Sequence, residues 1–143
     1  MIKSEAFMLK RFADHPIYNY QFFSNPSLEG IGVIRPVKVN EAVAYRIVDW
    51  FGEIAKFPAF CQSLTSFALE HDIAYVDLYV TGVSPDLLAI GELKPISESV
   101  IIPNYLEPLV LKNVEISYMT SAPVLPFFLR GDGDQDRPSN LNS

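Results

Sequence analysis

The chain has 143 residues, of which 49% are hydrophobic and 13% aromatic, and it carries a net charge of −6. This length fits one domain with a sizeable apolar core, and the composition excludes an intrinsically disordered chain. The acidic balance argues against nonspecific binding to nucleic acid or to an anionic membrane surface, because both need a basic footprint.

The first half of the sequence has the pattern of β-strands. Aromatic side chains alternate along residues 16–23 (PIYNYQFF), as on a half-buried strand. Two further β-rich runs, residues 31–39 and 42–50, are separated only by Asn40 and Glu41. This spacing predicts a tight hairpin.

The second half alternates helices with strands. Apolar residues recur at helical spacing from Phe57 to Ala68, which predicts an amphipathic helix of about four turns. An apolar strand over residues 73–81 (IAYVDLYVT) follows. Ser84 and Pro85 then have the pattern of an N-cap and a first helical residue, so we expect a second, short helix.

Two more strands are expected in SVIIP and in residues 113–120 (NVEISYMT). The resulting order of strands and helices predicts an α/β (α+β) fold. Its sheet is mixed and largely antiparallel, with a βαβ crossover. We assign residues 1–129 to a single domain and residues 130–143 to a polar, Asp-rich tail or flap.

The single cysteine, Cys61, cannot form an internal disulfide, which favours a reducing, cytoplasmic compartment. No apolar run approaches the roughly 20 residues of a membrane-spanning helix. The stretch MIKSEAFMLKRF carries scattered charges and has no apolar core, unlike a signal peptide. We therefore expect a cytoplasmic protein with neither a membrane partner nor a nucleic-acid partner.

Several stretches resemble one protein family. EHDIAYVDLYVTG followed by SPDLLAIGEL is similar to the fifth strand and fourth helix of the GNAT fold, the fold of acyl-CoA N-acyltransferases. HPIYNY, YRIVDWFG, IIPNYLEP, NVEIS and DGDQDRP together resemble the C-terminal portion of an uncharacterised GNAT-like bacterial group associated with surface-polysaccharide gene clusters. The likeness to this group spans residues 15–140, and the general GNAT likeness spans residues 45–120.

The resemblance implies a GNAT-like C-terminal half, with acyl transfer from acetyl-CoA to an amino sugar or a related amine. GNAT enzymes bind the pyrophosphate of acetyl-CoA with a Q/R-x-x-G-x-G/A loop after the fourth strand. This chain has DWFGEIAKFPAF there, in which Gly52 is the only glycine and Glu53 adds a negative charge. SPDLLAIGEL also lacks the tyrosine that many GNAT enzymes use as general acid. The acyl-CoA site is therefore predicted to be degenerate.

Two arginines are candidate substrate-binding residues. If Asn40-Glu41 is a two-residue loop, Arg35 lies directly opposite Arg46 on the neighbouring strand. Facing like charges are destabilising unless something lies between them. A bound anion such as a phosphate or a substrate carboxylate would meet that need. Alternatively, nearby carboxylates balance the arginines, or a longer loop or a slipped register separates them.

Asp49 and Asp77 each interrupt an apolar strand near its C-terminal end, where ligands gather in open α/β sheets. Asp77 shares a strand face with Tyr79. A half-buried aspartate beside a tyrosine can act as a general base, so Asp49, Asp77 and Tyr79 are candidate catalytic residues. Alternatively, each aspartate is structural, paired with Arg46 or with backbone N–H groups.

Asn104, Tyr105 and Glu107 lie in PNYLEP, between two prolines that hold the backbone extended. They are candidate substrate-binding residues in a groove. The alternative is a rigid connection in which Tyr105 packs on the core.

The sequence has no recognisable metal or nucleophile motif. The helical spacing places Cys61 on an apolar face, which indicates a core position. HExxH, zinc-cluster, Walker and G-x-S-x-G patterns are all absent. We predict no metal, and no cofactor beyond the acetyl-CoA that the resemblance implies.

The stretch RGDGDQDRPSN has aspartates at alternate positions, like the start of an EF-hand loop. Counted from Asp132, that loop requires Gly and Glu where this chain has Arg137 and Ser143. A solvated tail, a weaker oxygen-ligand site and a flap that folds back all remain open. The resemblance favours the flap, in which Asp134, Asp136 and Arg137 meet a basic substrate or a partner subunit.

Two classes of function stay open. The first is an acyltransferase-like enzyme acting on an amine, which predicts acyl-CoA binding. The second is a non-catalytic module that recognises a carbohydrate precursor or docks a partner domain. The resemblance further implies a homodimer or docking to a partner lobe.

Overall fold

The computed structural model describes residues 3–24, 27, 29–102, 113, 119, 121, 123–124 and 126–133. The elements of the first half are α1 (Glu5–Met8), the π-helical turn η1 (Leu9–Ala13), β1 (Gln21–Phe23), β2 (Ile31–Val39) and β3 (Ala42–Phe51). The later elements are the 3₁₀ turn η2 (Ile54–Lys56), α2 (Phe57–Glu70), β4 (Val76–Leu78), β5 (Val80–Thr81), α3 (Pro85–Ile90), β6 (Phe128–Leu129) and the 3₁₀ turn η3 (Arg130–Asp132).

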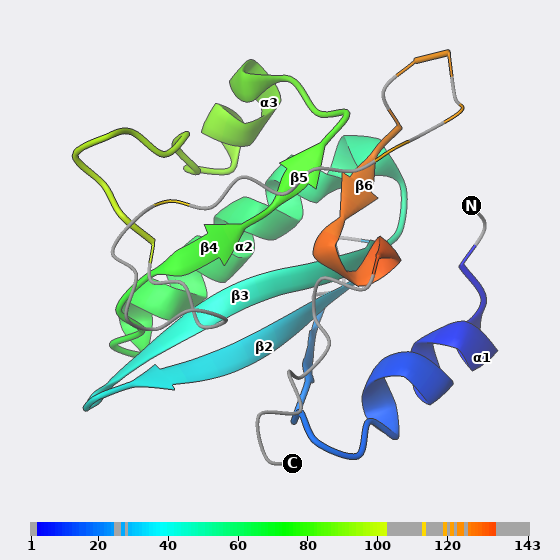
Figure 1. Ribbon diagram of the computed structural model, residues 1–143, viewed down its shortest axis with the longest axis horizontal. Coiled ribbons are helices and arrows are strands. Elements are labelled where there is room, and N and C mark those ends of the chain that lie inside the picture. The colour runs from blue at the N-terminus through cyan, green and yellow to red at the C-terminus, as the bar shows by residue number, and fades with distance from the viewer. Residues whose placement is uncertain are drawn as a thin grey trace.

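The described part of the chain forms a mixed α+β fold around a four-stranded sheet with the order β1-β2-β3-β4. β1, β2 and β3 pair antiparallel, whereas β4 is parallel to β3 and is reached through α2. The expectation of a mixed, largely antiparallel sheet is confirmed. β5 and β6 form a separate antiparallel pair, drawn above β3 in Figure 1.

The hairpin between β2 and β3 has the predicted register. Val39 faces Ala42 and Arg35 faces Arg46, so the loop consists of Asn40 and Glu41. The register then shifts, because Val33 faces Asp49 while the next residue, Ile34, faces Ile47. Val48 is therefore an extra residue in β3, as in a β-bulge, and the bulge changes which later side chains face each side of the sheet.

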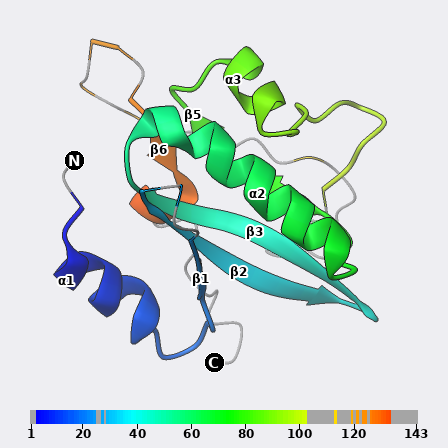
Figure 2. The same ribbon diagram turned by 180° about the vertical axis from the view of Figure 1, so that it is seen from behind.

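Helices cover both faces of the sheet, so β3 is buried on both sides from Ala44 to Trp50. α2 lies against one face (Figure 2) and buries Phe57, Phe60 and Leu64 there. The turn η1 brings Phe12 to a smaller cluster that contains Tyr20, Val33 and Val48. Period-2 alternation is therefore lost in β3, as expected of a strand covered twice.

Some predicted elements differ from the structure in extent. The expected strand over residues 16–23 begins only at Gln21, because His15 Nδ1 accepts the backbone N–H groups of Ile17 and Tyr18 and folds a turn there. The run over residues 73–81 is split into β4 and β5, which pair with different strands. Within the described residues of SVIIP, Val100 forms an isolated bridge with Ser97, which precedes that stretch. Pro103 and most of residues 113–120 lie outside the described residues.

Candidate functional site

β3 carries two buried charges at the centre of the sheet. Arg46 is 3% exposed and Asp49 is 0% exposed. Their surroundings differ, because Arg46 precedes the bulge at Val48 and Asp49 follows it. Each charge needs a partner, since an isolated buried ion is strongly destabilising.

Arg46 and Asp77 form a buried, bidentate ion pair. Arg46 Nε donates to Asp77 Oδ1 at 2.9 Å, and Arg46 Nη2 donates to Asp77 Oδ2 at 2.6 Å. The two residues are register partners in the parallel β3–β4 pair, so the sheet itself aligns them. Of the alternatives considered for the facing arginines, a neighbouring carboxylate is therefore the one observed beside Arg46.

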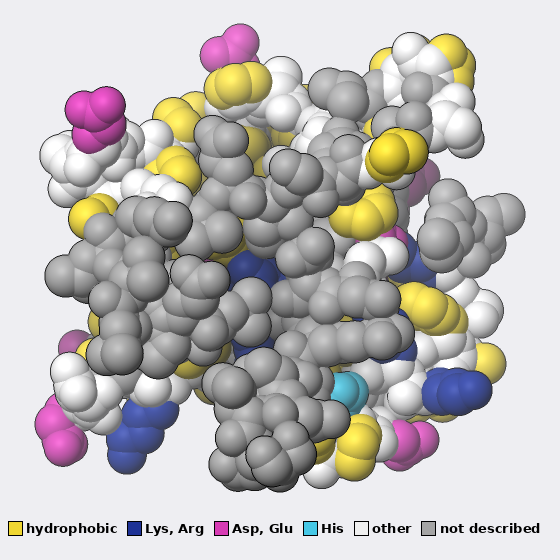
Figure 3. Space-filling model, viewed as in Figure 1, with side chains coloured by type: hydrophobic (Ala, Val, Ile, Leu, Met, Phe, Trp, Pro, Cys, Tyr) yellow, Lys and Arg dark blue, Asp and Glu magenta, His cyan; other side chains and the backbone are white. Residues whose placement is uncertain are grey.

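Arg35 faces Arg46 across the hairpin, as the loop length predicts. Its guanidinium carbon lies 4.1 Å from the ring centroid of Tyr18, a cation–π contact. The face shown in Figure 3 has basic side chains near its middle, whereas most visible acidic side chains lie at its edge. Other basic side chains of this face lie at its lower left and right edges, so its positive charges are both central and peripheral.

Asp49 is held by a backbone donor and a lysine. Its Oδ1 accepts the N–H of Trp50 at 2.8 Å and also an ion-paired hydrogen bond from Lys3 Nζ. Among the described residues no donor reaches the buried Oδ2. Burial raises the pKa of Asp49 from 3.8 to about 6, although the nearby Lys3 ammonium acts to lower it.

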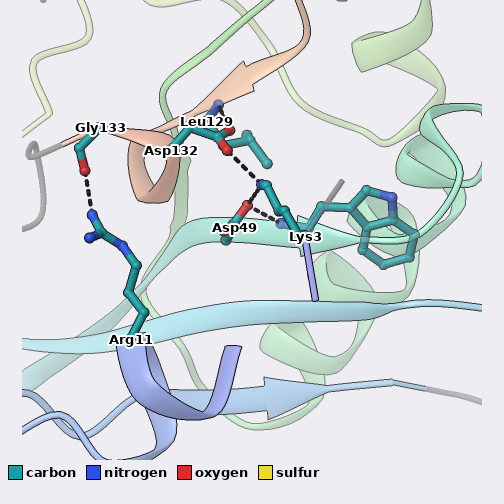
Figure 4. Close-up of polar contacts among 7 residues, drawn as sticks. Lys3, Arg11, Asp49, Leu129, Asp132 and Gly133 are labelled. Carbon is teal, nitrogen blue, oxygen red and sulfur yellow. Dashed lines mark hydrogen bonds and ion pairs between the residues drawn. The ribbon is translucent and has the colours of Figure 1, made fainter. Parts of the chain in front are cut away.

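Lys3 bridges two carboxylates from distant parts of the sequence (Figure 4). Besides Asp49, its ammonium contacts Asp132 Oδ1 at 2.8 Å. The other carboxylate oxygen of Asp132 accepts the N–H of Leu129 at 2.8 Å, which fixes the start of η3. The Lys3 site, defined here as Lys3, Asp49 and Asp132, thus joins the segment before α1 to β3 and η3.

The residues that open the aspartate run are packed in the fold. Arg130 and Gly131 are buried, and Arg130 lies over the ring of Tyr79, at 4.4 Å from its centroid. Arg11 from η1 donates to the carbonyl of Gly133 (Figure 4). Residues 130–133 are therefore held against β3 and η1.

A cavity of about 640 Å³ adjoins the Lys3 site. Four aromatic side chains line it, namely Trp50, Phe51, Phe127 and Phe128. Its wall also includes two charged side chains, Lys3 and Asp132. A mostly apolar wall with few polar groups is typical of small-molecule sites. Gly52 also lies in this wall.

A second cavity of about 500 Å³ lies between β4, β5 and α3. Aliphatic side chains dominate its lining, and Asp77 and Tyr79 belong to the wall. Both carboxylate oxygens of Asp77 accept hydrogen bonds from Arg46.

The predicted site residues separate into three groups. Arg46 pairs with Asp77. Arg35 makes a cation–π contact with Tyr18, and Tyr79 makes one with Arg130. Asp49 belongs to the Lys3 site. The remaining candidates lie outside the described residues: Asn104, Tyr105, Glu107, Asp134, Asp136 and Arg137. The structure thus gives Asp49 and Asp77 different partners rather than one shared site.

Sequence reasoning missed Lys3. The helix that positions it does have a sequence signal, because Ser4 caps α1 by accepting the N–H of Phe7 at 3.2 Å, and Glu5 lies in the first turn. Nothing in the spacing of Lys3 relates it to Asp49 or Asp132. That relation arises only when β3, α1 and η3 come together.

Cys61 lies on the buried face of α2 and belongs to the core, as its helical position predicts. Burial raises the pKa of its thiol to about 12. The thiol is therefore protonated at neutral pH and is a poor nucleophile.

The chain matches no known family model, no curated protein and no solved structure. Across the part of the chain that the structure describes, no group of three or more His, Cys, Asp or Glu side chains is arranged to hold a metal ion. Within the same residues, no helix combines the length and the apolar character needed to cross a bilayer.

Proposed function

We propose that the protein is a GNAT-like binding module that recognises a small, carbohydrate-type ligand carrying an amine. The observation that carries the proposal is the aromatic cavity whose wall includes Lys3 and Asp132. Aromatic rings offer flat apolar surfaces to a sugar ring, and charged groups at the wall fix its orientation.

The charge of the Lys3 site supports an amine on the ligand. One lysine serves both Asp49 and Asp132, so the ionised site carries one unbalanced negative charge. A ligand ammonium compensates that charge and donates hydrogen bonds to carboxylate oxygens. A neutral sugar lacks this contribution, and an anionic ligand is repelled.

The arrangement beside β3 supports a module without the usual acyl-CoA site. In the GNAT fold that the sequence resembles, acyl-CoA occupies a splay between the fourth and fifth strands. The corresponding strands here, β3 and β4, pair over only three residues. Beyond that pairing, Gly131 packs so tightly that an added Cβ would lie 2.9 Å from the carbonyl oxygen of Val48. The protein's own η3 therefore occupies space beside β3.

Acyl transfer to an amine is the second candidate function, and Asp49 favours it. Its pKa of about 6 leaves the carboxylate mostly ionised at neutral pH and still basic enough to accept a proton. Asp49 would then be the general base toward the amine of the acceptor, and acetyl-CoA the acyl donor. This candidate requires CoA to enter by a route other than the family's Gly-rich loop.

Ligand titration distinguishes the two functions. Trp50 is the only tryptophan of the chain and lies in the cavity wall, so its fluorescence reports binding there. We expect glucosamine to change this fluorescence and to raise the melting temperature in a saturable way. N-acetylglucosamine is the matched control, because acetylation removes the positive charge and keeps the ring.

Acetyl-CoA and CoA complete the test. A saturable stabilisation by either would favour the acyltransferase over the binding module. If neither amino sugar nor CoA changes the fluorescence or the melting temperature at millimolar concentration, the proposed ligand class is wrong. Replacing Phe128 by Ala in the cavity wall is expected to weaken glucosamine binding if the signal arises from this cavity.

A further inference from the structure

The two carboxylates of the Lys3 site are oriented without help from Lys3. Asp49 Oδ1 accepts the N–H of its neighbour Trp50, and Asp132 Oδ2 accepts the N–H of Leu129, each at 2.8 Å. Both side chains are nearly inaccessible, at 0% and 6% exposure. β3 and η3 therefore hold a pair of acceptors in place by their own backbones.

The same place is suited to a cation in two further ways. The ring of Phe51 lies under the Lys3 ammonium, with its centroid 5.4 Å from Nζ. The second oxygen of Asp49 is buried, and no donor among the described residues reaches it. An unpartnered buried carboxylate oxygen has a strong tendency to bind a donor or a positive charge.

We infer that Asp49, Asp132 and Phe51 form a binding site for a primary ammonium group, which Lys3 of the chain itself occupies in the free protein. A primary ammonium has three N–H donors, enough to satisfy both carboxylates and the remaining oxygen of Asp49. Lys3 belongs to the short segment before α1, and it lines the cavity together with Asp132. A free amine entering the cavity competes with Lys3 for the site.

This assignment goes beyond the proposed ligand, because it holds for any primary ammonium whether or not a sugar ring carries it. It also gives Lys3 a regulatory role, since a resident lysine lowers the apparent affinity for a competing amine. Removal of Lys3 is therefore expected to increase the affinity for small ammonium ions.

Chemical rescue of the Lys3→Ala variant tests the inference on the full chain. The variant lacks the propylammonium portion of the lysine, so propylammonium is the probe. At pH 8, where Asp49 of the wild-type protein is ionised and paired with Lys3, we expect the variant to melt below the wild-type protein. Propylammonium should raise its melting temperature with saturation, whereas 1-propanol and tetramethylammonium at equal ionic strength should not.

The variant K3A/D49N provides the matched control. It keeps the vacated volume and loses one carboxylate charge, so we expect binding of propylammonium at least about tenfold weaker than in K3A. Equal stabilisation of K3A, K3A/D49N and the wild-type protein would overturn the inference. Glucosamine is not used here, so failure of rescue and failure of carbohydrate binding are separate results.

A folding defect in K3A does not remove the test. In that case the variant is refolded with propylammonium or with tetramethylammonium, and the yield of folded protein is measured by circular dichroism. A yield that increases with propylammonium alone supports the ammonium site. Equal yields in the two salts would contradict it.

Discussion

Asp77 and Asp49 are buried carboxylates of neighbouring strands in the same sheet, yet their charges are balanced in different ways. Asp77 pairs with Arg46, its register partner on β3, through a bidentate contact. Asp49 shares Lys3 with Asp132 and keeps one oxygen without a donor among the described residues. The sheet supplies the first partner, whereas the second comes from outside the sheet.

The difference separates a structural charge from one available to a ligand. Arg46 and Asp77 neutralise each other, so the pair gains little from any further ion. The Lys3 site has a net negative charge and borders a cavity. Both aspartates met the same sequence criterion, an acidic residue in an apolar strand, so their partners and not their positions distinguish them.

Breaking the Arg46–Asp77 pair is expected to have the largest effect. Arg46→Met leaves Asp77 buried without its ionic partner, which costs about 3–5 kcal/mol of unfolding free energy. Urea denaturation followed by circular dichroism measures the loss. The double variant R46M/D77L removes both charges and should recover most of it, because apolar residues can replace a buried pair. A double variant as unstable as R46M would mean that Arg46 acts mainly through other contacts.

Asp49→Asn should have the opposite sign at neutral pH. The folded-state pKa of about 6 lies above the ordinary 3.8, so burial disfavours the charged form of Asp49 relative to the unfolded chain. Stability from this group is fully present below pH 3.8 and is lost as the pH rises through about 6, a change of about 3 kcal/mol. The neutral asparagine therefore stabilises the protein at pH 7.5 by up to that amount, and the advantage vanishes near pH 4.

Urea midpoints of the wild-type protein and D49N between pH 4 and pH 8 test this prediction. The titration of other groups contributes equally to both proteins, so only their difference is interpreted. A difference that does not change with pH would show that Asp49 titrates normally.

The sequence predicts the β2–β3 hairpin that positions Arg46, and it predicts the helix α2 that follows β3. A two-residue loop at Asn40-Glu41 sets Arg35 opposite Arg46, and the apolar spacing from Phe57 predicts α2. Such features depend on local spacing and turn length. The sequence leaves the parallel partner of Arg46 open, because a βαβ unit does not specify its register.

The Lys3 site could not be predicted in the same way. A β-bulge at Val48 adds one residue to β3 beside this site. No sequence pattern marks the bulge, because β3 is apolar on both faces. Lys3 and Asp132 are separated from Asp49 by long stretches of chain, so only tertiary packing relates them. The sequence leaves a polar tail and a flap that folds back both open for residues 130–143. In the structure Gly131 is buried, because its missing side chain allows close approach to β3.

Gly131→Ala tests whether this close approach maintains the Lys3 site. The added Cβ would lie 2.9 Å from the Val48 carbonyl oxygen and 3.0 Å from the Cβ of Asp49. Because a backbone atom is involved, η3 must shift, and we expect a loss of about 1–3 kcal/mol. The shift should also change the pH profile of stability attributed to Asp49. A Gly131→Ala protein with wild-type stability and a wild-type pH profile would show that η3 is not tightly packed.

Substitutions of Asp132 should have the smallest effect on stability. They separate its hydrogen bond to the N–H of Leu129 from its ion pair with Lys3. Asp132→Asn keeps an oxygen for the N–H of Leu129 and loses the charge beside Lys3, whereas Asp132→Ala loses both. Restoring the cap contact is worth about 1 kcal/mol, so D132N should be more stable than D132A by that amount. Equal urea midpoints for the two variants would mean that the cap contributes nothing. Lys3 keeps its ion pair with Asp49 in both variants. We therefore expect D132N to lose less stability than R46M, because the charge at the Lys3 site is shared among three groups whereas that of Arg46 is confined to one pair.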